Sequence, residues 1–326
     1  MKRRTIFLSL SFLHFTAICI GQKNVISLLN DRFSFTFPDS AKNTARAKDI
    51  MSADRNEDKE TRVVYDINDK RIVFFAEEMY LKSISDLEAS LRKESTAEYP
   101  LTVKQLFNKD SVFGITLTPS VFDSTKQAIL TSILVIKNAD NTLSRMSVYL
   151  NAKAYANKKT FDAIVDGVYA SFKKGTRRLS LDARTEKFKA LNTTTTLSVK
   201  LPKDYIVTKD RGVDFEVYNV RKVPAYGAED RGGIIVYFGF YPSPFSTEYQ
   251  LVNFKTAETN GEFRQEKIKW LNYEDTSRKL ILREQLFPDD KIQQGAKIHI
   301  AILSGDPKEI EELTAIVRDF SLSYGK

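Results

Sequence analysis

Histidine and cysteine, which carry much of the nucleophilic and metal-binding chemistry of proteins, are almost absent from this chain. Its 326 residues contain two histidines, His14 and His299, and one cysteine, Cys19. A structural zinc site takes four ligands, mostly Cys and His, and a Ser-His or Cys-His dyad needs an imidazole beside its nucleophile. His14 and Cys19 lie near the N-terminus, in a segment expected to be removed. We therefore expect no metal site and no cofactor.

His299 lies in a predicted strand at residues 297–303. Strand alternation places it on the face opposite the three isoleucines of this strand. Its neighbours at i±2, Lys297 and Ala301, offer it no acidic partner on its own strand. We therefore interpret His299 as a structural or surface residue rather than a base. Its replacement by Ala is expected to change the free energy of unfolding by about 1 kcal/mol or less.

Two fragments of known motifs lack their companion residues. Ser90 and Lys93 have Ser-x-x-Lys spacing, but the Ser-Asp-Asn and Lys-Thr-Gly elements of penicillin-binding proteins and β-lactamases are missing. The segment 54–65 begins like an EF-hand loop, but Lys59 replaces its glycine and Tyr65 its bidentate glutamate. We assign neither a catalytic dyad nor a calcium site to these segments.

Paired carboxylates leave one catalytic alternative open, because glycoside hydrolysis needs only two of them about 5–10 Å apart. Glu77 and Glu78 are adjacent in a predicted strand, so they point to opposite faces and cannot form this pair. Glu216, Glu266 and Glu284 are strand carboxylates of the second half of the chain, and any two of them would meet if their strands are neighbours. A hydrolase that uses strand carboxylates is therefore the alternative to a binding protein.

The first 21 residues have the layout of a bacterial secretory signal peptide. Three cations at positions 2–4 precede an uncharged apolar run at 6–20, and Gly21 closes the run with a small side chain. A membrane anchor is an alternative, although about 20 apolar residues are needed to cross a bilayer. A lipoprotein tethered through Cys19 is another, although the residues before Cys19 do not match such a signal. We expect cleavage between Gly21 and Gln22 and a periplasmic or secreted protein without a stable membrane anchor.

The charge of the chain is mildly basic and spread along the sequence. The formal net charge of +8 includes three cations of the signal peptide, whose removal lowers it to +5. A nucleic-acid-binding protein gathers Lys and Arg into one stripe or patch. The one dense basic cluster, at residues 173–178, falls in a predicted linker and is interpreted as a solvated connector. We therefore expect another protein as the partner and no nucleic acid.

The two halves of the chain are predicted to contain the same series of elements. Each opens with an alternating strand that ends in proline, at residues 33–38 and 197–202. Each then continues with two strands, a helix, three strands and an amphipathic helix, the last near 161–172 and 310–320. The predicted fold class is α+β, with two tandem, mostly antiparallel sheets flanked by helices, each half in the order β3-α-β3-α. The predicted boundaries are 1–21 for the signal peptide, 22–174 for the first domain, 175–190 for the linker and 191–326 for the second domain.

This order of elements resembles the fold shared by the photosystem PsbP protein and the Ran-binding Mog protein. The resemblance rests on the opening strand that ends in proline, the antiparallel sheet, and a terminal helix that finishes at Ser171-Phe172 and at Asp319-Phe320. It implies a tandem PsbP/Mog-like protein. Known members of that family act as binding and assembly proteins without an active site. No functional motif of the family matches this chain, so the resemblance implies no site residues.

Five aromatic residues between positions 237 and 245 form the one stretch that is typical of a contact surface. Most of them are explained by a core strand that runs into a proline-containing turn. Tyr241 and Phe245 lie near the turn, where aromatic side chains often anchor a partner. The sequence therefore predicts an exported, non-catalytic binding or scaffold protein that acts through these two rings. The carboxylate-dependent hydrolase and an inhibitor or immunity-type protein are the alternatives.

The signal peptide can be tested by the intact mass of the exported protein. The mass should match a chain that begins at Gln22, with or without cyclisation of Gln22 to pyroglutamate, because the apolar run ends at Gly21. A mature form that keeps Cys19 with acyl chains attached would instead establish the lipoprotein.

Overall fold

The computed structural model describes residues 24–43, 60–95, 102–106, 111–117, 128–190, 195–228, 232–287 and 296–323. Strands hold 54% of these residues and helices 18%. The protein is therefore mostly β, and the predicted α+β class with a regular β3-α-β3-α order is wrong. The signal-peptide residues Gly21 and Gln22 and the first half of the EF-hand-like segment lie outside the described residues.

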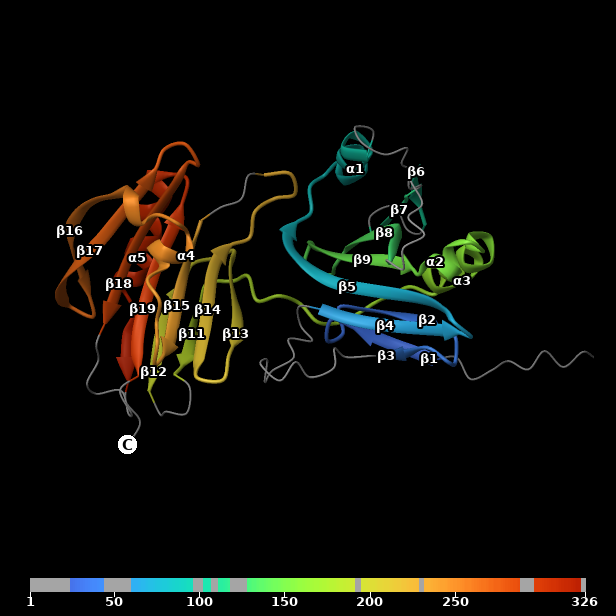
Figure 1. Cartoon of the computed structure of the whole chain (residues 1–326), viewed down its shortest axis with the longest axis horizontal. Coiled ribbons are helices and arrows are strands. Elements are labelled where there is room, and N and C mark those ends of the chain that lie inside the picture. The colour runs from blue at the N-terminus through green and yellow to red at the C-terminus, as the bar shows by residue number, and fades with distance from the viewer. Residues whose placement is uncertain are drawn as a thin grey trace, which may run out of the picture.

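The first half, residues 24–182, contains two antiparallel sheets and three helices in the described ranges (Figure 1). Its elements are β1 (Asn24–Leu28), β2 (Phe33–Phe37), β3 (Lys42–Asn43), β4 (Glu60–Ile67), β5 (Lys70–Lys82), α1 (Leu87–Ser95), β6 (Thr102–Gln105), β7 (Val112–Thr116), β8 (Ile129–Lys137), β9 (Thr142–Leu150), α2 (Ala152–Tyr155), α3 (Lys158–Ala170) and β10 (Lys173–Lys174).

The second half, residues 184–323, has the same sheet composition but shorter helical segments after its third long strand. Its elements are β11 (Arg184–Lys189), β12 (Thr196–Leu201), β13 (Tyr205–Arg211), β14 (Phe215–Lys222), β15 (Gly233–Gly239), α4 (Phe245–Glu248), the 3-10 helix η1 (Val252–Phe254), β16 (Lys255–Phe263), β17 (Glu266–Asp275), β18 (Leu280–Phe287), β19 (Lys297–Ser304), α5 (Pro307–Arg318) and β20 (Ser321–Ser323).

The two halves have the same strand order. The seven-stranded sheets run β3-β4-β5-β9-β8-β7-β6 and β13-β14-β15-β19-β18-β17-β16, and the three-stranded sheets run β1-β2-β10 and β11-β12-β20. The register also corresponds, because Lys173 pairs with Ser34 in the first half and Ser321 pairs with Ser198 in the second. Two supersecondary units with one topology therefore lie in tandem along the chain.

Each half has its main core between the seven-stranded sheet, the three-stranded sheet and one amphipathic helix. Strand β2 and helix α3 contribute alternating phenylalanines and a helical apolar stripe to the first core, and β12 and α5 do the same in the second with aliphatic strand residues. Helix α5 begins as the sequence suggests, because Asp306 accepts a hydrogen bond from the N–H of Lys308 and Pro307 occupies the first turn.

The helices that were expected at equivalent places after the third strand differ between the halves. Helix α1 has nine residues, whereas α4 in the second half has four and is followed by the three-residue η1. Pro244 is compatible with the start of α4, but Gln250 has a positive φ of 57°, so the chain cannot continue as one helix across this segment. The single helix expected at this place in the second half is therefore divided into α4 and η1.

The segment 175–190, expected to be a solvated linker, is bound to both halves. Strand β11 lies within it and pairs with β12. Before β11, the N–H and hydroxyl of Thr176 both donate to Asp31, and the N–H of Leu179 donates to Asp140. A Cβ on Gly175 would lie 2.0 Å from the carbonyl oxygen of Asp31, so only glycine allows this close approach.

Arg32 is fully buried and joins four segments of the first half. Its guanidinium donates to Glu78 on β5 at 2.7 Å and to Asp140 in the β8–β9 turn at 2.6 Å. It also donates to Thr142 and to the carbonyl oxygen of Arg177 in the segment before β11. A buried charge is tolerated only when it is paired and hydrogen-bonded, and Arg32 is both. We call Arg32, Glu78, Asp140 and Thr142 the Arg32 cluster.

The two acids of the Arg32 cluster differ in the direction of their pKa shifts. Burial raises the pKa of Glu78 despite the neighbouring Arg32. Burial also works to raise the pKa of Asp140, but hydrogen bonds from Arg32, Thr142 and the N–H of Leu179 outweigh it and lower this pKa. Glu78 therefore bears more of the desolvation cost of the cluster, and Asp140 is the better-stabilised carboxylate.

Replacing Arg32 tests the cluster. Arg32→Met should lower the free energy of unfolding by about 3–5 kcal/mol, because it leaves two buried carboxylates without their cation. Arg71→Met is the matched control, since Arg71 pairs with Asp66 on the surface and an exposed pair contributes about 0–1 kcal/mol. Urea unfolding followed by circular dichroism measures both. Equal losses in the two variants would contradict a central role for Arg32.

Candidate functional site at the junction of the two halves

The end of β5 joins the two halves beyond their covalent connection (Figure 1). The N–H of Lys82 donates to the carbonyl oxygen of Pro224, and the N–H of Tyr226 donates to the carbonyl oxygen of Lys82. The ammonium of Lys82 lies 2.7 Å from the carboxylate of Asp204. This short contact between backbones, reinforced by an ion pair, fixes the distance between the halves at this point.

Tyr80 is brought to this junction by an irregularity in β5. The register between β5 and β9 shifts between Glu78 and Leu81, and Tyr80 has a positive φ of 54°. A bulge re-aims the side chain at its centre, and a bulky residue with positive φ is a strained position. The Tyr80 ring packs against Ile206 and Val223 of the second half. The guanidinium of Arg221 lies 5.3 Å from the ring centre, within cation–π range.

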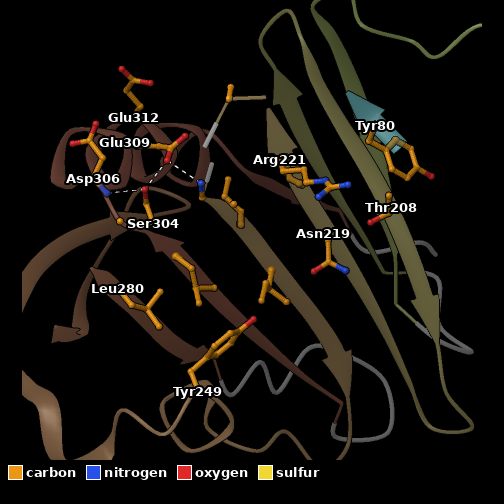
Figure 2. A pocket seen from close by; sticks show the side chains of 18 of the residues that line it. Tyr80, Thr208, Asn219, Arg221, Tyr249, Leu280, Ser304, Asp306, Glu309 and Glu312 are labelled. Atoms are coloured by element: carbon orange, nitrogen blue, oxygen red, sulfur yellow. Dashed lines mark hydrogen bonds between the residues drawn. The ribbon is translucent and has the colours of Figure 1, made fainter. Parts of the chain in front are cut away.

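A cleft of about 1200 Å³ opens beside this junction. Figure 2 shows Tyr80, Thr208, Asn219 and Arg221 on one side of it and the first residues of α5 on the other. Most of its lining comes from β13, β14, β15, the end of β19 and the start of α5, and Glu78 and Tyr80 of β5 complete it. Its lining therefore combines both halves, as is common for ligand sites at domain interfaces.

The start of α5 presents a closed hydrogen-bond network to the cleft. The Glu309 carboxylate accepts from the hydroxyl of Ser304 at 2.5 Å and from the N–H of Gly232 at 2.9 Å, and the Ser304 hydroxyl accepts from the N–H of Asp306 at 3.0 Å (Figure 2). A Cβ on Gly232 would lie 2.0 Å from the carbonyl oxygen of Leu303, so glycine is required there. The Glu309 carboxylate therefore connects the start of α5 to the ends of β15 and β19 in the wall of the cleft.

Three charged residues of the cleft wall have fewer contacts with neighbouring protein groups. Glu312 and Asp210 are exposed, and Asp210 accepts only a long hydrogen bond, of 3.5 Å, from the amide of Asn219. Lys279 lies at the rim and has a positive φ of 49° in the turn before β18. The cleft therefore offers charges of both signs to a ligand, and it suits a polar segment better than an apolar molecule.

The structure separates the two aromatic residues that were predicted to anchor a partner. Tyr241 is 82% exposed, so its ring is available for contact. Phe245 is 6% exposed and packs on the ring of His299, with the ring centres 4.6 Å apart. Phe245 begins α4 and covers the sheet, which explains why an aromatic residue stands beside the prolines of this turn. Its ring is part of a core rather than of the surface.

His299 has an acidic partner that its own strand did not reveal. Its Nε2 lies 3.0 Å from the carboxylate of Glu284 on the neighbouring strand β18, and both side chains are buried. The expected face is confirmed, because His299 points away from the isoleucines of β19. The surface alternative is wrong, because His299 is buried. Its acidic partner comes from the adjacent strand and not from i±2, where the sequence was searched.

Glu284 accepts hydrogen bonds from three groups on this face of the described sheet. It accepts from the N–H of Phe245 at 2.8 Å and from the N–H of Ser246 at 3.3 Å, in addition to His299. Burial works to raise the pKa of Glu284, but the hydrogen bonds from His299, Ser246 and Phe245 outweigh it and hold this pKa below its usual 4.5. Nδ1 of His299 is buried without a hydrogen-bond partner in the described structure.

The remaining sequence candidates do not assemble into a catalytic arrangement in the described residues. Glu77 bonds to Arg145 and Glu78 to Arg32, in agreement with their opposite faces. Glu216 forms an ion pair with Lys209 and accepts a hydrogen bond from Tyr218. It lies on β14, which is separated from the strand of Glu284 by β15 and β19. Ser90 and Lys93 both lie on α1. The described ranges contain no group of three or more His, Cys, Asp or Glu side chains with metal-site geometry.

Two further observations concern the whole chain. Within the described residues, every helix is too short or too polar to cross a membrane. Comparison of the chain with protein-family models and with curated proteins finds no match. The resemblance to PsbP and Mog therefore stays a prediction.

Sequence reasoning missed the residues that form the junction. Tyr80 and Arg221 are separated by 141 positions, and nothing in the strand pattern around Tyr80 indicates a bulge. Glu309 lies in the first turn of α5, where an acid favours the helix start, and its bonds to Ser304 and Gly232 cannot be read from that position. The adjacent glycines at 232 and 233 were the one available signal, since paired glycines at a strand start mark a close backbone approach.

Replacing His299 tests the buried pair. His299→Ala should lower the free energy of unfolding by about 1–3 kcal/mol at pH 7, because the buried Glu284 carboxylate loses its side-chain donor. The loss should shrink on acidification. The lowered pKa of Glu284 means that its contribution is present above pH 4.5 and disappears as the pH falls through the folded-state value.

Urea unfolding at pH 7 and at about pH 4 measures these differences. The double variant with Glu284→Gln is the control, because the effect of His299→Ala should be smaller once the carboxylate is absent. Equal effects of His299→Ala with and without Glu284 would contradict an interaction between the two side chains.

Proposed function

We propose that this chain is an exported binding protein that works through contact with another protein, and that the cleft at the junction of its two halves receives a polar segment of that partner. The main observation behind this proposal is the cleft. It measures about 1200 Å³, and residues from both halves line it. Ligand sites favour concave surfaces at domain interfaces because several elements there converge on one volume.

The junction supports this use of the cleft because it fixes the position of Tyr80 beside walls that the second half supplies. Lys82 binds backbone and side-chain groups of the second half, and Tyr80 fills the contact between them. A preformed site loses less conformational freedom on binding than one that must close around its ligand. The polar lining also fits a peptide segment, whose backbone needs hydrogen-bond partners when it is removed from water.

Three of the five carboxylates that line the cleft have structural partners, and the other two, Asp210 and Glu312, are exposed. Glu78 is engaged by Arg32, Asp306 by the first turn of α5, and Glu309 by Ser304 and Gly232. Glu78 and Glu309 hold the surrounding segments together through these bonds, and Asp306 fixes the start of its helix. A hydrolytic pair needs two carboxylates free to face the same bond of a substrate. No specific observation favours the hydrolase or the inhibitor.

Site-specific photo-crosslinking in the native cell tests this function. A photoreactive residue at Thr208 lies in the cleft, and one at the exposed Tyr241 tests the surface predicted from the sequence. Val25 on β1 is the matched control, since it is exposed and remote from the cleft in the sheet order. We expect a discrete adduct of one mass from Thr208 that is absent from Val25.

The same adduct from Tyr241 would extend the contact surface to that ring. An adduct from Tyr241 alone would place binding at the turn and contradict the cleft. Equal labelling at Thr208 and Val25 would contradict the proposal as a whole, because a bound partner shields and contacts only one of these places.

A further inference from the structure

Residues 240–254, which connect β15 to β16, lie as a strap across one face of the second seven-stranded sheet. Phe245, Tyr249 and Leu251 of this strap pack on side chains of β17, β18 and β19. Helix α5 packs on the opposite face of the same sheet, against the isoleucines of β19. The strap therefore covers these apolar residues of the sheet. They would become exposed to water if the strap moved away.

The strap contains little regular secondary structure. It contains one four-residue helix and one three-residue 3-10 helix, with a positive φ at Gln250 between them. Isolated helices of this length are not stable in water, so contacts with the sheet must hold the strap. The backbone hydrogen bonds within the strap are short-range turn contacts. A segment that is outside the strand ladders in this way can open locally while the rest of the protein stays folded.

Two charged side chains, one on β18 and one in the β17–β18 turn, hold the strap by its backbone. Glu284 accepts the N–H groups of Phe245 and Ser246 at its start. Arg278 donates to the carbonyl oxygens of Tyr249 and Gln250 near its centre, and Asp275 orients this arginine through an ion pair of 2.6 Å. The Arg278 contact is exposed, whereas the Glu284 contact is buried. A charge-assisted bond in a buried site is the stronger of the two.

We propose that the strap is a lid over the apolar face of β17, β18 and β19, which the buried carboxylate of Glu284 holds shut and which opens when that carboxylate loses its negative charge. Protonation changes Glu284 from an acceptor of three hydrogen bonds into a neutral acid that accepts them more weakly. The covered face, with Leu251, Tyr273, Leu282 and Ala301, would then become accessible.

The direction of the pH dependence follows from the groups around Glu284. The titratable side chains on this face include Tyr237 of β15, Tyr273 and Asp275 of β17, Lys297 and His299 of β19, and Glu248 and Tyr249 of the strap. His299 and the two N–H groups keep the pKa of Glu284 below 4.5. Closure is therefore favoured at neutral pH, and this stabilisation is lost as the pH falls through the lowered value.

The lid can be tested by thiol labelling at Leu251, which is fully buried. The full-length chain with Cys19→Ser contains no other cysteine. Leu251→Cys in this background reports opening, and the adjacent Val252→Cys is the matched control for intrinsic reactivity, since Val252 is 57% exposed. Val236→Cys on the opposite face reports global unfolding, because Val236 is buried in the other core.

We expect Glu284→Gln to raise the labelling rate of the Leu251→Cys variant about ten-fold or more at pH 7, relative to the Val252→Cys variant, while the thiol at position 236 stays protected. An unchanged ratio of the rates at positions 251 and 252 would overturn the proposal. A parallel rise at positions 251 and 236 would also overturn it, because exposure would then come from unfolding of the whole second half.

A pH series on the protein with Glu284 intact gives an independent test if Glu284→Gln does not fold. 4,4′-Dithiodipyridine labels thiols in acid as well as at neutral pH, and the ratio to the rate at position 252 cancels its own pH dependence. The ratio for position 251 should rise between pH 7 and about pH 3.5, in the region where a carboxylate with a lowered pKa gains its proton. A flat ratio over this range, with position 236 protected, would contradict the lid.

Discussion

A guanidinium removed from water must be neutralised where it lies, and this constraint on Arg32 organises the first half of the protein. Its partners are Glu78 on β5, Asp140 and Thr142 at the β8–β9 turn, and a carbonyl oxygen of the segment that leads to β11. These segments must therefore meet at one point. The bulge at Tyr80 lies two residues after Glu78 on the same strand, so the cluster also sets where Tyr80 reaches the second half and where the cleft opens.

The two halves place their buried charges differently on one topology. Register places Thr196 of the second half at the position of Arg32, so the second half has no arginine there. Its buried pair, Glu284 and His299, lies instead on the outer face of the seven-stranded sheet, under the strap. With the same strand order, the first half therefore uses Arg32 to bind the connecting segment, and the second half has an apolar sheet face covered by the strap. Sites are set by individual side chains on a common frame.

The sequence pattern predicted what depends on local periodicity. The opening strands, the central strands and helices α3 and α5 follow from alternation and helical spacing, and so does the face on which His299 lies. Edge strands such as β16 were missed because eight of its nine residues face solvent at least in part, so no apolar alternation marks them. The second-half helix was predicted from Ser246 and the apolar spacing after it, but the positive φ at Gln250 divides the segment into two short helices.

The order of residues along the chain is enough to establish a tandem series of apolar strands, two terminal amphipathic helices and a scarcity of histidine and cysteine. It does not establish which polar groups meet, and these contacts come from the folded arrangement: Arg32 with Glu78, Tyr80 with Arg221, and Glu284 with His299. The burial of Phe245 beside the exposed Tyr241 also depends on that arrangement. Periodicity reports which face of an element avoids water, whereas a polar contact depends on strand order and register, and these are set by the packing of the whole chain.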